Sequence, residues 1–439
     1  MNVGFISLGC SKNLVDTEMT IGLFKKKGYT IVNAPEEADI LVINTCGFIQ
    51  SAKEEAIETI LEMAQYKQQR CRFLIVMGCL VQRYKAELEK EIPEVDLFIR
   101  YDSYDTIWEQ IESVIEPEKK VVGNRKDCQL AFLDRTITTG EHYAYLRIAE
   151  GCSNRCTYCA IPSIRGPFVS RTIEDILEEA NKLVNEGYQE LIVIAQDTTK
   201  YGLDIYGEPR LAQLLQKLEA IPGVKWIRFL YAYPETITDE LIEVVKNSQK
   251  ICHYFDIPIQ HIADSVLKRM HRQSNGASIR HLIEKLRRQI PDVIIRTTVM
   301  VGFPGETKEN FEELYDFVKW AKFDKLGAFA YSKEENTPAE RLKEQIHPMT
   351  KKSRYRKIME LQQPIAEQCL KEKVGNRYTV LIETTTFDGK YYVGRTYMDV
   401  PDMDGLVYLP VEREALEGKF LECEITQVQG YDLIGKIVE

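Results

Sequence analysis

The sequence contains no run of eighteen apolar residues, which is about the length that a helix needs to cross a bilayer. Its first residues, MNVGFISLGC, lack the basic start and the long apolar middle of a secretory signal. The sequence also contains no internal repeat and no low-complexity stretch. We therefore expect a cytosolic protein that has no membrane partner.

An excess of basic residues is absent as well. The 57 Lys and Arg residues are outnumbered by 67 Asp and Glu residues, and the net charge is −10. Because a general nucleic-acid binder normally presents a basic surface, this composition argues against one. The length of 439 residues, with 44% hydrophobic and 28% charged residues, predicts a soluble globular protein of about two to four domains.

Eleven cysteines are present, and a reducing cytosol makes disulfides an unsuitable explanation for them. Clustered cysteines in that compartment more often bind metal or carry out chemistry. Scattered single cysteines are usually small buried hydrophobic side chains. We interpret the five cysteines that share no pattern as structural, namely Cys71, Cys128, Cys252, Cys369 and Cys423.

The first part of the chain, up to about residue 100, alternates short apolar runs with amphipathic stretches. Strands that alternate with helices indicate a parallel sheet with helices on both faces. Gly28 is well placed to end the first helix, and polar residues 116–127 are expected to lead into a linker. The strands are predicted at residues 3–8, 40–44 and 73–77, and the helices at residues 13–27, 51–69 and 82–92.

The alternation resumes on a larger scale between residues 140 and 369. Successive strands with helical patterns between most of them predict a full or partial (β/α) barrel, whose active site lies at the C-terminal ends of the strands. A helix at residues 349–370 is expected to connect this barrel to the last part of the chain. The strands are predicted at residues 143–148, 190–195, 226–231, 254–257, 293–301 and 327–331.

The last part, from about residue 371, has short alternating runs separated by turn signals such as FDG and PDMDG. These runs predict a small closed antiparallel β-barrel. The fold class is therefore α/β multidomain, with domains expected at residues 1–135, 136–370 and 371–439. The strands of the last domain are predicted at residues 378–382, 391–395, 407–410, 421–427 and 432–438.

The strongest motif is the cysteine triplet Cys152, Cys156 and Cys159, in EGCSNRCTYCA. Three closely spaced thiolates let one loop wrap a soft-metal centre, and only three local ligands leave a coordination position open. A structural zinc site would be closed by a fourth ligand, and a ferredoxin-like cluster is the other alternative. The C-x3-C-x2-C spacing, with Tyr158 before the last cysteine, resembles the radical S-adenosylmethionine (SAM) superfamily. That resemblance implies a 4Fe-4S cluster whose open iron binds SAM.

A second triplet, Cys10, Cys46 and Cys79, is spread along the first part of the chain. Each cysteine comes shortly after a predicted strand, in FISLGC, LVINTC and IVMGC. Because the C-terminal ends of parallel strands lie along one edge of a sheet, the three side chains can converge there. A second cluster with three protein ligands would fit that position. The alternative is that buried cysteines are common near strand ends.

Together the two triplets resemble those of the methylthiotransferase family, and the resemblance runs over essentially the whole chain. The family has an N-terminal cluster domain, a central radical SAM partial barrel and a C-terminal TRAM barrel, in the order of the three predicted segments. The resemblance implies two 4Fe-4S clusters and SAM as cofactors. It assigns Cys10, Cys46 and Cys79 to the auxiliary cluster, and Cys152, Cys156 and Cys159 to the SAM-binding cluster.

Several stretches resemble the branch of the family that modifies an aspartate of small-subunit ribosomal protein twelve, the RimO type. Members of that branch more often have proline where this chain has Ser11, a departure that spares the cysteine. The matching stretches are SLGCSKNLVDTE, NTCGFI, AQDTTKYG, PIQHIADSVLKRMHR, VGFPGET and YSKEENTPA.

The resemblance also implies contacts to SAM by Tyr158, Gln196, Gly302 and Glu306. VGFPGE can instead be only a tight strand-to-helix turn, and Glu306 only a charge in the first turn of a helix.

Members of the family use one cluster to cleave SAM to a deoxyadenosyl radical, while the auxiliary cluster carries the sulfur that is transferred. The resemblance implies the same chemistry here, with a low-potential electron donor such as flavodoxin or ferredoxin. Hydrogen removal from an unactivated carbon is beyond an acid–base side chain, so no catalytic side chain is assigned. His253, His261 and His271 are interpreted as structural.

Charge bears on the choice between a protein and an RNA substrate. Residues 371–439 contain eight Lys or Arg and thirteen Asp or Glu, a net charge of −5, which suits a basic ribosomal protein and repels phosphate. Asp399, Asp402 and Asp404 are expected to contribute to this attraction from one turn, and the alternative is that DVPDMD is only a polar loop. The basic run Lys351, Lys352, Arg354, Arg356 and Lys357 is the counter-evidence, since it could face RNA, but its helical spacing and nearby acids favour a solvated helix face.

Two other functions remain open at this point. A related enzyme of the MiaB type would modify tRNA adenosines, although the acidic last segment does not favour direct tRNA binding. A non-enzymatic electron-transfer iron–sulfur protein is the alternative from another class.

Overall fold

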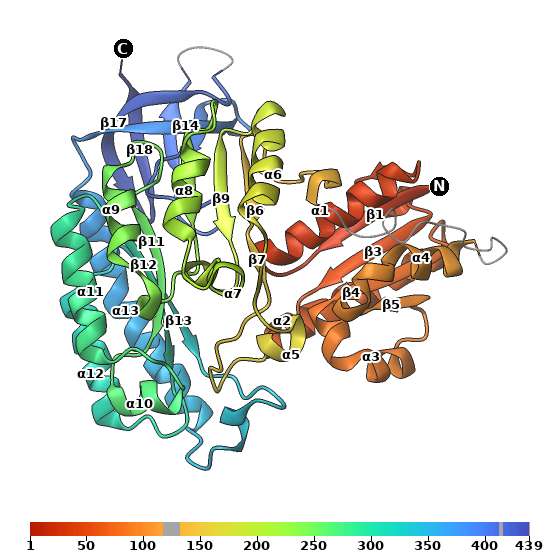
Figure 1. The fold of residues 1–439 in the computed structure, drawn as a ribbon, viewed down its shortest axis with the longest axis horizontal. Coiled ribbons are helices and arrows are strands. Elements are labelled where there is room, and N and C mark those ends of the chain that lie inside the picture. The colour runs from red at the N-terminus through yellow and green to blue at the C-terminus, as the bar shows by residue number, and fades with distance from the viewer. Residues whose placement is uncertain (117–131, 412–415, 439) are drawn as a thin grey trace.

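The computed structural model describes residues 1–116, 132–411 and 416–438. Most of the predicted linker at residues 116–127, and Cys128, lie outside the described residues. The N-terminal sheet stands to the right of a larger central part, and a small barrel lies at the top of that part (Figure 1). Among the described residues, no helix is both long enough and apolar enough to cross a membrane.

The N-terminal sheet is parallel throughout, with strand order β2-β1-β3-β4-β5. The three predicted strands are confirmed as β1, β3 and β4. Two short edge strands, β2 and β5, are additional, and each is too short to show an alternating pattern in the sequence. The bounds are β1 Asn2–Ser7, β2 Thr30–Val32, β3 Ile40–Thr45, β4 Phe73–Gly78 and β5 Leu97–Ile99.

Helices cover both faces of this sheet, as expected (Figure 1). One apolar cluster packs α2 and α3 on one face, and another packs α1 and α4 on the other. Gly28 ends α1 with a positive φ of 85° and donates its N–H to the carbonyl of Lys25. The bounds are α1 Ser11–Lys26, α2 Gln50–Ala64, α3 Cys79–Glu91 and α4 Ile107–Ile115, with 3₁₀ turns at Pro35–Glu37, Gln65–Gln68 and Tyr101–Thr106.

The central part is a partial barrel made from all six predicted strands. They form two parallel three-stranded sheets, ordered β10-β9-β6 and β11-β12-β13. The two sheets meet where Ile227 of β10 forms a parallel bridge with Ile251, just before β11. The bounds are β6 Tyr143–Arg147, β9 Glu190–Ile194, β10 Trp226–Phe229, β11 Tyr254–Gln260, β12 Ile294–Val301 and β13 Lys325–Ala330.

Amphipathic helices surround this barrel and bury their apolar faces in its main core. Thr307 begins α12 with a capping box, and the long α13 leads to the last domain as predicted. A two-residue pair, β7 Ala149–Glu150 with β8 Val169–Ser170, is additional. The helices are α5 Ile161–Arg165, α6 Ile173–Asn185, α7 Leu203–Tyr206, α8 Leu211–Glu219, α9 Asp239–Asn247, α10 Asp264–Arg269, α11 Gly276–Gln289, α12 Lys308–Ala321 and α13 Pro348–Lys371.

The C-terminal part is a closed barrel of the five predicted strands, in the order β14-β15-β16-β18-β17. Four of its pairs are antiparallel, and the pair of β16 with β18 is parallel. An odd number of strands cannot alternate in direction around a closed ring, so one parallel pair is unavoidable. The bounds are β14 Arg377–Thr385, β15 Tyr391–Arg395, β16 Val407–Pro410, β17 Phe420–Gln429 and β18 Asp432–Ile437.

This small barrel covers the N-terminal ends of the central strands. Glu190, at the start of β9, is fully buried between Arg395 of β15, at 2.7 Å, and Arg228 of β10. Arg228 also donates to the backbone carbonyl of Thr396 at 2.8 Å. The C-terminal ends of the central strands therefore remain on the side away from this barrel, where the cysteine loop and the N-terminal sheet meet.

Candidate site between two cysteine triplets

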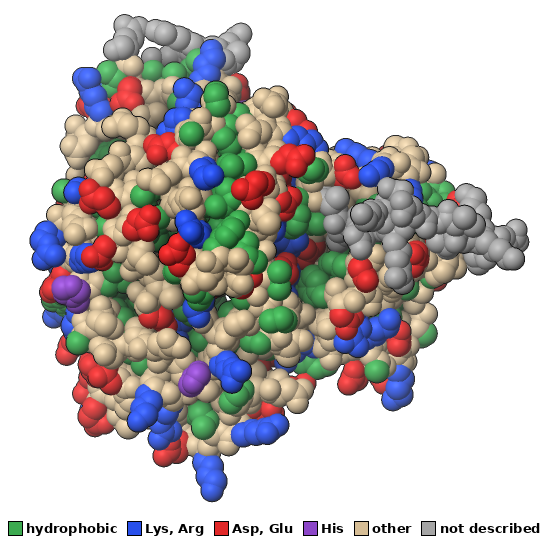
Figure 2. Space-filling view, in the orientation of Figure 1, with side chains coloured by type: hydrophobic (Ala, Val, Ile, Leu, Met, Phe, Trp, Pro, Cys, Tyr) green, Lys and Arg blue, Asp and Glu red, His purple; other side chains and the backbone are tan. Residues whose placement is uncertain are grey.

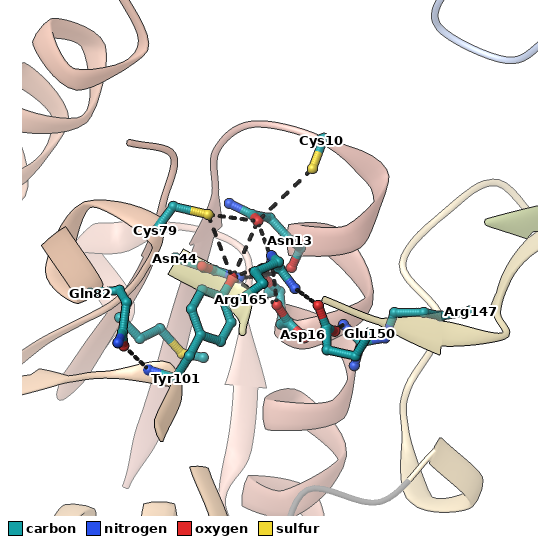
Figure 3. A network of polar contacts seen from close by, with 12 residues as sticks. Cys10, Asn13, Asp16, Asn44, Cys79, Gln82, Tyr101, Arg147, Glu150 and Arg165 are labelled. Carbon is teal, nitrogen blue, oxygen red and sulfur yellow. Dashed lines mark hydrogen bonds and ion pairs between the residues drawn. The ribbon is translucent and has the colours of Figure 1, made fainter. Parts of the chain in front are cut away.

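The loops that follow β1, β3 and β4 bring Cys10, Cys46 and Cys79 to one edge of the N-terminal sheet. The Sγ atoms of Cys10 and Cys79 lie 4.0 Å and 3.6 Å from the same atom, Oδ1 of Asn13 (Figure 3). Cys79 is buried, Cys46 is half-buried and Cys10 is exposed. The strands thus carry the three thiols to the same region, as the sheet-edge argument predicts.

Three glycines beside these cysteines let the loops approach one another. A Cβ on Gly9, whose φ is +95°, would lie 2.8 Å from Cβ of Cys46. A Cβ on Gly47 would lie 2.7 Å from the backbone of Leu80, and one on Gly78, at φ +105°, would lie 2.5 Å from the carbonyl oxygen of Thr45, the last residue of β3. Only glycine fits such contacts and angles. The pairs GC, CG and GC in the sequence were a signal of this close approach.

Two of these thiols, those of Cys46 and Cys79, are hindered from ionising. Burial raises the pKa of Cys46 to about 11, and negative charge on Cys79 and Cys10 acts in the same direction. Burial also raises the pKa of Cys79, and the nearby Arg165 opposes that rise. A cation that binds all three thiolates would relieve their repulsion. The donor chemistry therefore fits a soft-metal centre.

Among the described residues, no three His, Cys, Asp or Glu side chains are gathered tightly enough to hold a single metal ion. A four-iron cluster binds its cysteines at separate corners, so its ligands stand further apart than those of one ion. The open spacing of each triplet is compatible with such a cluster.

The second triplet lies in the loop that leaves the C-terminal end of β6 and β7. Cys152 and Cys156 are buried and Cys159 is half-buried. The N–H of Cys159 donates to the carbonyl of Cys156 at 3.1 Å, and the N–H of Ile161 approaches Sγ of Cys159 at 3.5 Å. Burial raises the pKa of Cys152 to about 11 and that of Cys159 to about 12, and their neighbouring thiols add to both shifts.

Contacts to neighbouring strand ends hold this loop at the mouth of the partial barrel. Asn154 donates to Asp197, just after β9, at 2.8 Å. The hydroxyl of Tyr233, in the loop after β10, lies 4.0 Å from Sγ of Cys156. The loop therefore occupies the C-terminal edge of the barrel, where active sites of such folds form.

The residues predicted to contact SAM surround the same mouth. Tyr158 meets Phe303 edge to face at 6.4 Å, and Gln196 is half-buried directly after β9. The carboxylate of Glu306 accepts the N–H groups of Gly302 and Phe303. It also pairs with Arg354 of α13 at 2.7 Å. This carboxylate secures the turn after β12, and contacts of these residues to a cofactor stay a prediction.

A polar network that the sequence did not predict joins the two triplets. Arg165, in α5 just after the second triplet, reaches into the N-terminal domain (Figure 3). It donates to Oδ1 of Asn13 at 2.7 Å and to Asp16 at 2.9 Å, and it also bonds the hydroxyl of Tyr101. The same Asn13 oxygen contacts two thiols of the first triplet. One arginine thus connects the loops of both triplets.

Four charges complete this network at the domain boundary. Asp16 pairs with Arg147 at 2.5 Å, and Glu150 pairs with Arg147 and Arg165 at 2.9 Å and 3.0 Å. Burial alone would raise the pKa of Glu150, but the two arginines hold it at about 2. The network lines a cavity of about 490 Å³. Polar residues on the buried face of α1, such as Asn13 and Asp16, were the available signal, because such residues need partners.

The expectation of an acidic binding turn is wrong for two of its three residues. Asp399 is buried and pairs with Lys325 at 2.6 Å. Asp404 accepts a hydrogen bond of 2.7 Å from Tyr254. Both carboxylates join the small barrel to the central barrel. Only Asp402 is exposed, and it accepts a longer bond of 3.3 Å from the hydroxyl of Tyr143 in β6. On the face shown in Figure 2, acidic and basic side chains are interspersed.

The basic run on α13 is a solvated face only in part. Lys351 donates to the carbonyl of Tyr331 at 2.9 Å, and Arg354 pairs with the buried Glu306. These two cations therefore support the barrel. The other three residues of the run, Lys352, Arg356 and Lys357, are exposed as expected.

The remaining histidines and cysteines have structural surroundings. His261 is buried, and burial together with Arg354 lowers its pKa to about 3, so its ring is neutral. His253 contacts Asp292 at 2.7 Å, and His271 is exposed at a positive φ. Of the cysteines interpreted as structural, the described ones are buried or half-buried, namely Cys71, Cys252, Cys369 and Cys423.

Three family models match consecutive parts of the chain. The Uncharacterized protein family UPF0004 matches residues 2–100, the Radical SAM superfamily matches residues 146–318 and the TRAM domain matches residues 374–438. The first match contains Cys10, Cys46 and Cys79, and the second contains the triplet after β7.

Full-length relatives are similar to this chain. It is 64% identical over 438 residues to "Ribosomal protein uS12 methylthiotransferase RimO" of Alkaliphilus oremlandii, covering 100% of this chain and 99% of that protein. It is 48% identical over 441 residues to the protein of the same name from Caldicellulosiruptor saccharolyticus, covering 100% of both. Its fold is similar to that of the radical S-adenosylmethionine methyltransferase TsrM from Kitasatospora setae. That comparison has a TM-score of 0.57 and 13% identity, and it covers 86% of this chain and 80% of the other.

Proposed function

This chain belongs to the ribosomal protein uS12 methylthiotransferase family, and we propose that it attaches a methylthio group to ribosomal protein uS12. It is a radical SAM methylthiotransferase with a C-terminal TRAM domain. The observation that carries the proposal is the 64% identity, over the full length, to a relative of that name. The position modified in our proposal is the β-carbon of an aspartate of uS12.

The radical SAM domain implies a 4Fe-4S cluster and SAM. We propose that Cys152, Cys156 and Cys159 hold this cluster, and that Cys10, Cys46 and Cys79 hold a second one. When bound, these groups supply a one-electron route to an unactivated carbon and the sulfur that is transferred. The proposal is supported by the raised pKa values of Cys46 and Cys159. Burial is the main cause, and neighbouring thiols raise both values further, a repulsion that a cationic iron centre relieves.

Arg165 and Asn13 are proposed to organise the second cluster's site. The charge of Arg165 lowers the pKa of the Cys79 thiol against the effect of burial, which favours the thiolate that iron requires. Asn13 holds the loops together, because its amide nitrogen donates to the carbonyls of Leu8 and Thr45 at 3.1 Å and 3.0 Å. Both groups keep the triplets in a fixed relation, which transfer between two centres needs.

We propose that Tyr158, Gln196, Gly302 and Glu306 flank SAM, which their place at the barrel mouth supports. The proposed domains are residues 1–135, 136–370 and 371–439. Helix α13 supports the last boundary, since it ends at Lys371 and leads directly into β14. A low-potential donor such as flavodoxin or ferredoxin is proposed as the electron source, and the cytosol as the location.

The test is mass spectrometry of products formed by the reconstituted enzyme with SAM and a reductant. Purified uS12 should gain one methylthio group, and fragmentation should place it on an aspartate. Purified tRNA, supplied in a parallel reaction, should gain none. A methylthio group found on tRNA adenosine, with unmodified uS12, would overturn the proposal and favour a tRNA-modifying enzyme.

A further inference from the structure

Lys12 is a buried cation beside the first cysteine triplet. It is the second residue of α1 and follows Cys10 by two positions. The residue is only 4% exposed, and its ammonium lies 3.1 Å from the centre of the Tyr231 ring. Lys12 belongs to the N-terminal domain and Tyr231 to the central barrel, so this contact crosses the boundary between them.

The ammonium of Lys12 has no carboxylate and no hydrogen-bond acceptor as a partner within residues 1–116, 132–411 and 416–438. Other buried cations of the chain differ in this respect. Arg165 pairs with Asp16 and Glu150, and Arg395 pairs with Glu190 and Glu383. A buried charge is unfavourable unless it is paired, and an aromatic face is a weaker partner than an anion. Lys12 would therefore be stabilised by an anionic ligand.

Tyr231 is held in an unusual conformation at this point. Its φ is +62°, a value that residues other than glycine seldom adopt. The backbone is fixed there because its N–H donates to Asp256 at 3.0 Å and its carbonyl accepts from the N–H of Thr198 at 3.2 Å. Strained residues that the surrounding structure holds in place cluster at functional sites. The ring is therefore a fixed support for the ammonium.

The contact between Lys12 and Tyr231 joins two segments, each of which is close in sequence to a residue of the site of one triplet. Lys12 is two residues after Cys10, and Tyr231 is two residues before Tyr233. The hydroxyl of Tyr233 is 4.0 Å from Sγ of Cys156. A substrate carbon that is activated at one cluster and receives sulfur from the other must lie between them, and this contact crosses the boundary between their two domains.

We propose that Lys12 binds the carboxylate of the substrate aspartate, an inference that rests on the proposed function. The carboxylate of an aspartate is bonded directly to its β-carbon, so an ammonium that holds the carboxylate also positions the reacting carbon. SAM carries a carboxylate too and is the other source of the same chemistry. Lys12 stands at the start of α1, two residues after Cys10, a proposed ligand of the cluster that carries the sulfur, and this position favours the substrate.

The test measures binding of labelled uS12 to the reconstituted holoenzyme by fluorescence anisotropy. Lys12→Met should weaken binding by about tenfold or more, since it removes one partner of a desolvated charge pair. Lys12→Arg should stay within about threefold of the parent, because the cation and its charge-assisted hydrogen bond to a carboxylate are kept. Lys25→Met, at an exposed position of the same helix, is the matched control and should bind like the parent.

A substrate variant makes the test independent of any damage to the enzyme. In uS12 the modified aspartate is replaced by asparagine, which removes the charge and keeps the shape. The parent should bind this variant about tenfold more weakly, and Lys12→Met should bind both forms equally. Parent binding that does not distinguish aspartate from asparagine overturns the inference, whatever Lys12→Met does.

Two further measurements, SAM affinity and methylthio transfer, separate the remaining outcomes. The dissociation constant for SAM should be unchanged in Lys12→Met. A rise in that constant, without a change in uS12 binding, would show that Lys12 binds the carboxylate of SAM and would overturn the substrate assignment. Methylthio transfer by the parent to uS12 reports on the proposed function separately. If the parent modifies uS12 while Lys12→Met still discriminates aspartate from asparagine as the parent does, only the Lys12 inference fails.

Discussion

Arg165 donates a hydrogen bond of 2.7 Å to Oδ1 of Asn13, across the boundary between the central barrel and the N-terminal sheet. The two residues are 152 positions apart in the sequence. The same Asn13 oxygen is 3.6 Å from the thiol of Cys79, and the same arginine follows Cys159 by six residues in the chain. This bond therefore links the position of one cysteine loop to that of the other.

Replacing Arg165 with Met should destabilise the protein and deplete iron from the first triplet. The change leaves Asp16 and Glu150 without this partner, and breaking a buried pair costs about 3–5 kcal/mol. It also removes the charge that lowers the pKa of Cys79. The melting temperature and the iron content per chain are the measurements. Arg356→Met is the control, because Arg356 is exposed, and equal effects of the two changes would contradict the role of the network.

Gly9→Ala should prevent assembly of the cluster on the first triplet. The new Cβ would lie 2.8 Å from Cβ of Cys46, at a φ of +95°. Iron should fall from about eight to about four atoms per chain, while reductive SAM cleavage persists. Gly28→Ala is a matched control, since Gly28 has a similar φ of +85° and no atom within 4 Å of its Cβ position. A full iron content in Gly9→Ala would show that the loops do not need this approach.

The two triplets should be separable by mutation. Alanine at all three positions of the SAM triplet should halve the iron and abolish formation of deoxyadenosine. Alanine at all three positions of the first triplet should also halve the iron, but it should spare SAM cleavage and stop methylthio transfer. Deoxyadenosine formed by the variant of the SAM triplet would contradict the assignment. An undiminished iron content in the variant of the first triplet would contradict it as well. The SAM triplet is Cys152, Cys156 and Cys159, and the first triplet is Cys10, Cys46 and Cys79.

The convergence of Cys10, Cys46 and Cys79 could be predicted because it follows from local patterns. Each predicted strand ends just before its cysteine, and parallel strands share an edge. Helix α3 begins at Cys79 itself, three residues before the predicted start, because Gly78 turns the chain there with a φ of +105°. Element boundaries of this kind depend on one residue's backbone angle more than on periodicity.

The bond between Arg165 and Asn13 could not be predicted in that way. It joins two helices of different domains, and no spacing in the sequence pairs residues so far apart. The prediction of an acidic binding turn was wrong for a related reason. Asp399 and Asp404 look solvated when only their neighbours in sequence are considered. Both are buried by strands of another domain, through Lys325 and Tyr254.

The buried His261 predicts a pH dependence of stability. Burial, together with Arg354, lowers its pKa from 6.5 to about 3. The unfolded chain takes up this proton near pH 6.5 and the folded chain does not, so the contribution to stability is intact above that pH and is lost as the pH falls toward 3. At pH 5 the loss should be about 2 kcal/mol.

Denaturant unfolding at pH 7 and pH 5 measures this effect. The free energy of unfolding of the parent should fall more between these two values than that of His261→Gln, whose side chain does not titrate. Exposed His271→Gln serves as the control and should follow the parent. An equal fall in the parent and in His261→Gln would mean that another group causes the acid sensitivity.

Asp404 and Asp402 lie in the same turn and should respond differently to the same change. Asp404→Asn weakens the hydrogen bonds that the buried carboxylate accepts, from Tyr254 at 2.7 Å and from the N–H of Val400 at 2.9 Å. Its charge also lies 3.6 Å from Lys325. We expect a loss of about 1–3 kcal/mol, seen as a melting temperature lower by a few degrees. Asp402→Asn should change less, because Asp402 is exposed, the asparagine oxygen can still accept the 3.3 Å bond from the Tyr143 hydroxyl, and asparagine tolerates the φ of +59°.

Both changes remove one negative charge from the C-terminal barrel. Measuring uS12 binding and the melting temperature therefore separates attraction of a basic partner from stabilisation of the contact between the two barrels. If the turn attracted a basic partner through its surface charge, both variants would weaken binding equally and the effect would disappear at high salt. A buried Asp404 instead predicts that its variant loses stability while Asp402→Asn keeps the parent's melting temperature. Equal melting temperatures for the two variants would show that Asp404 does not join the two barrels.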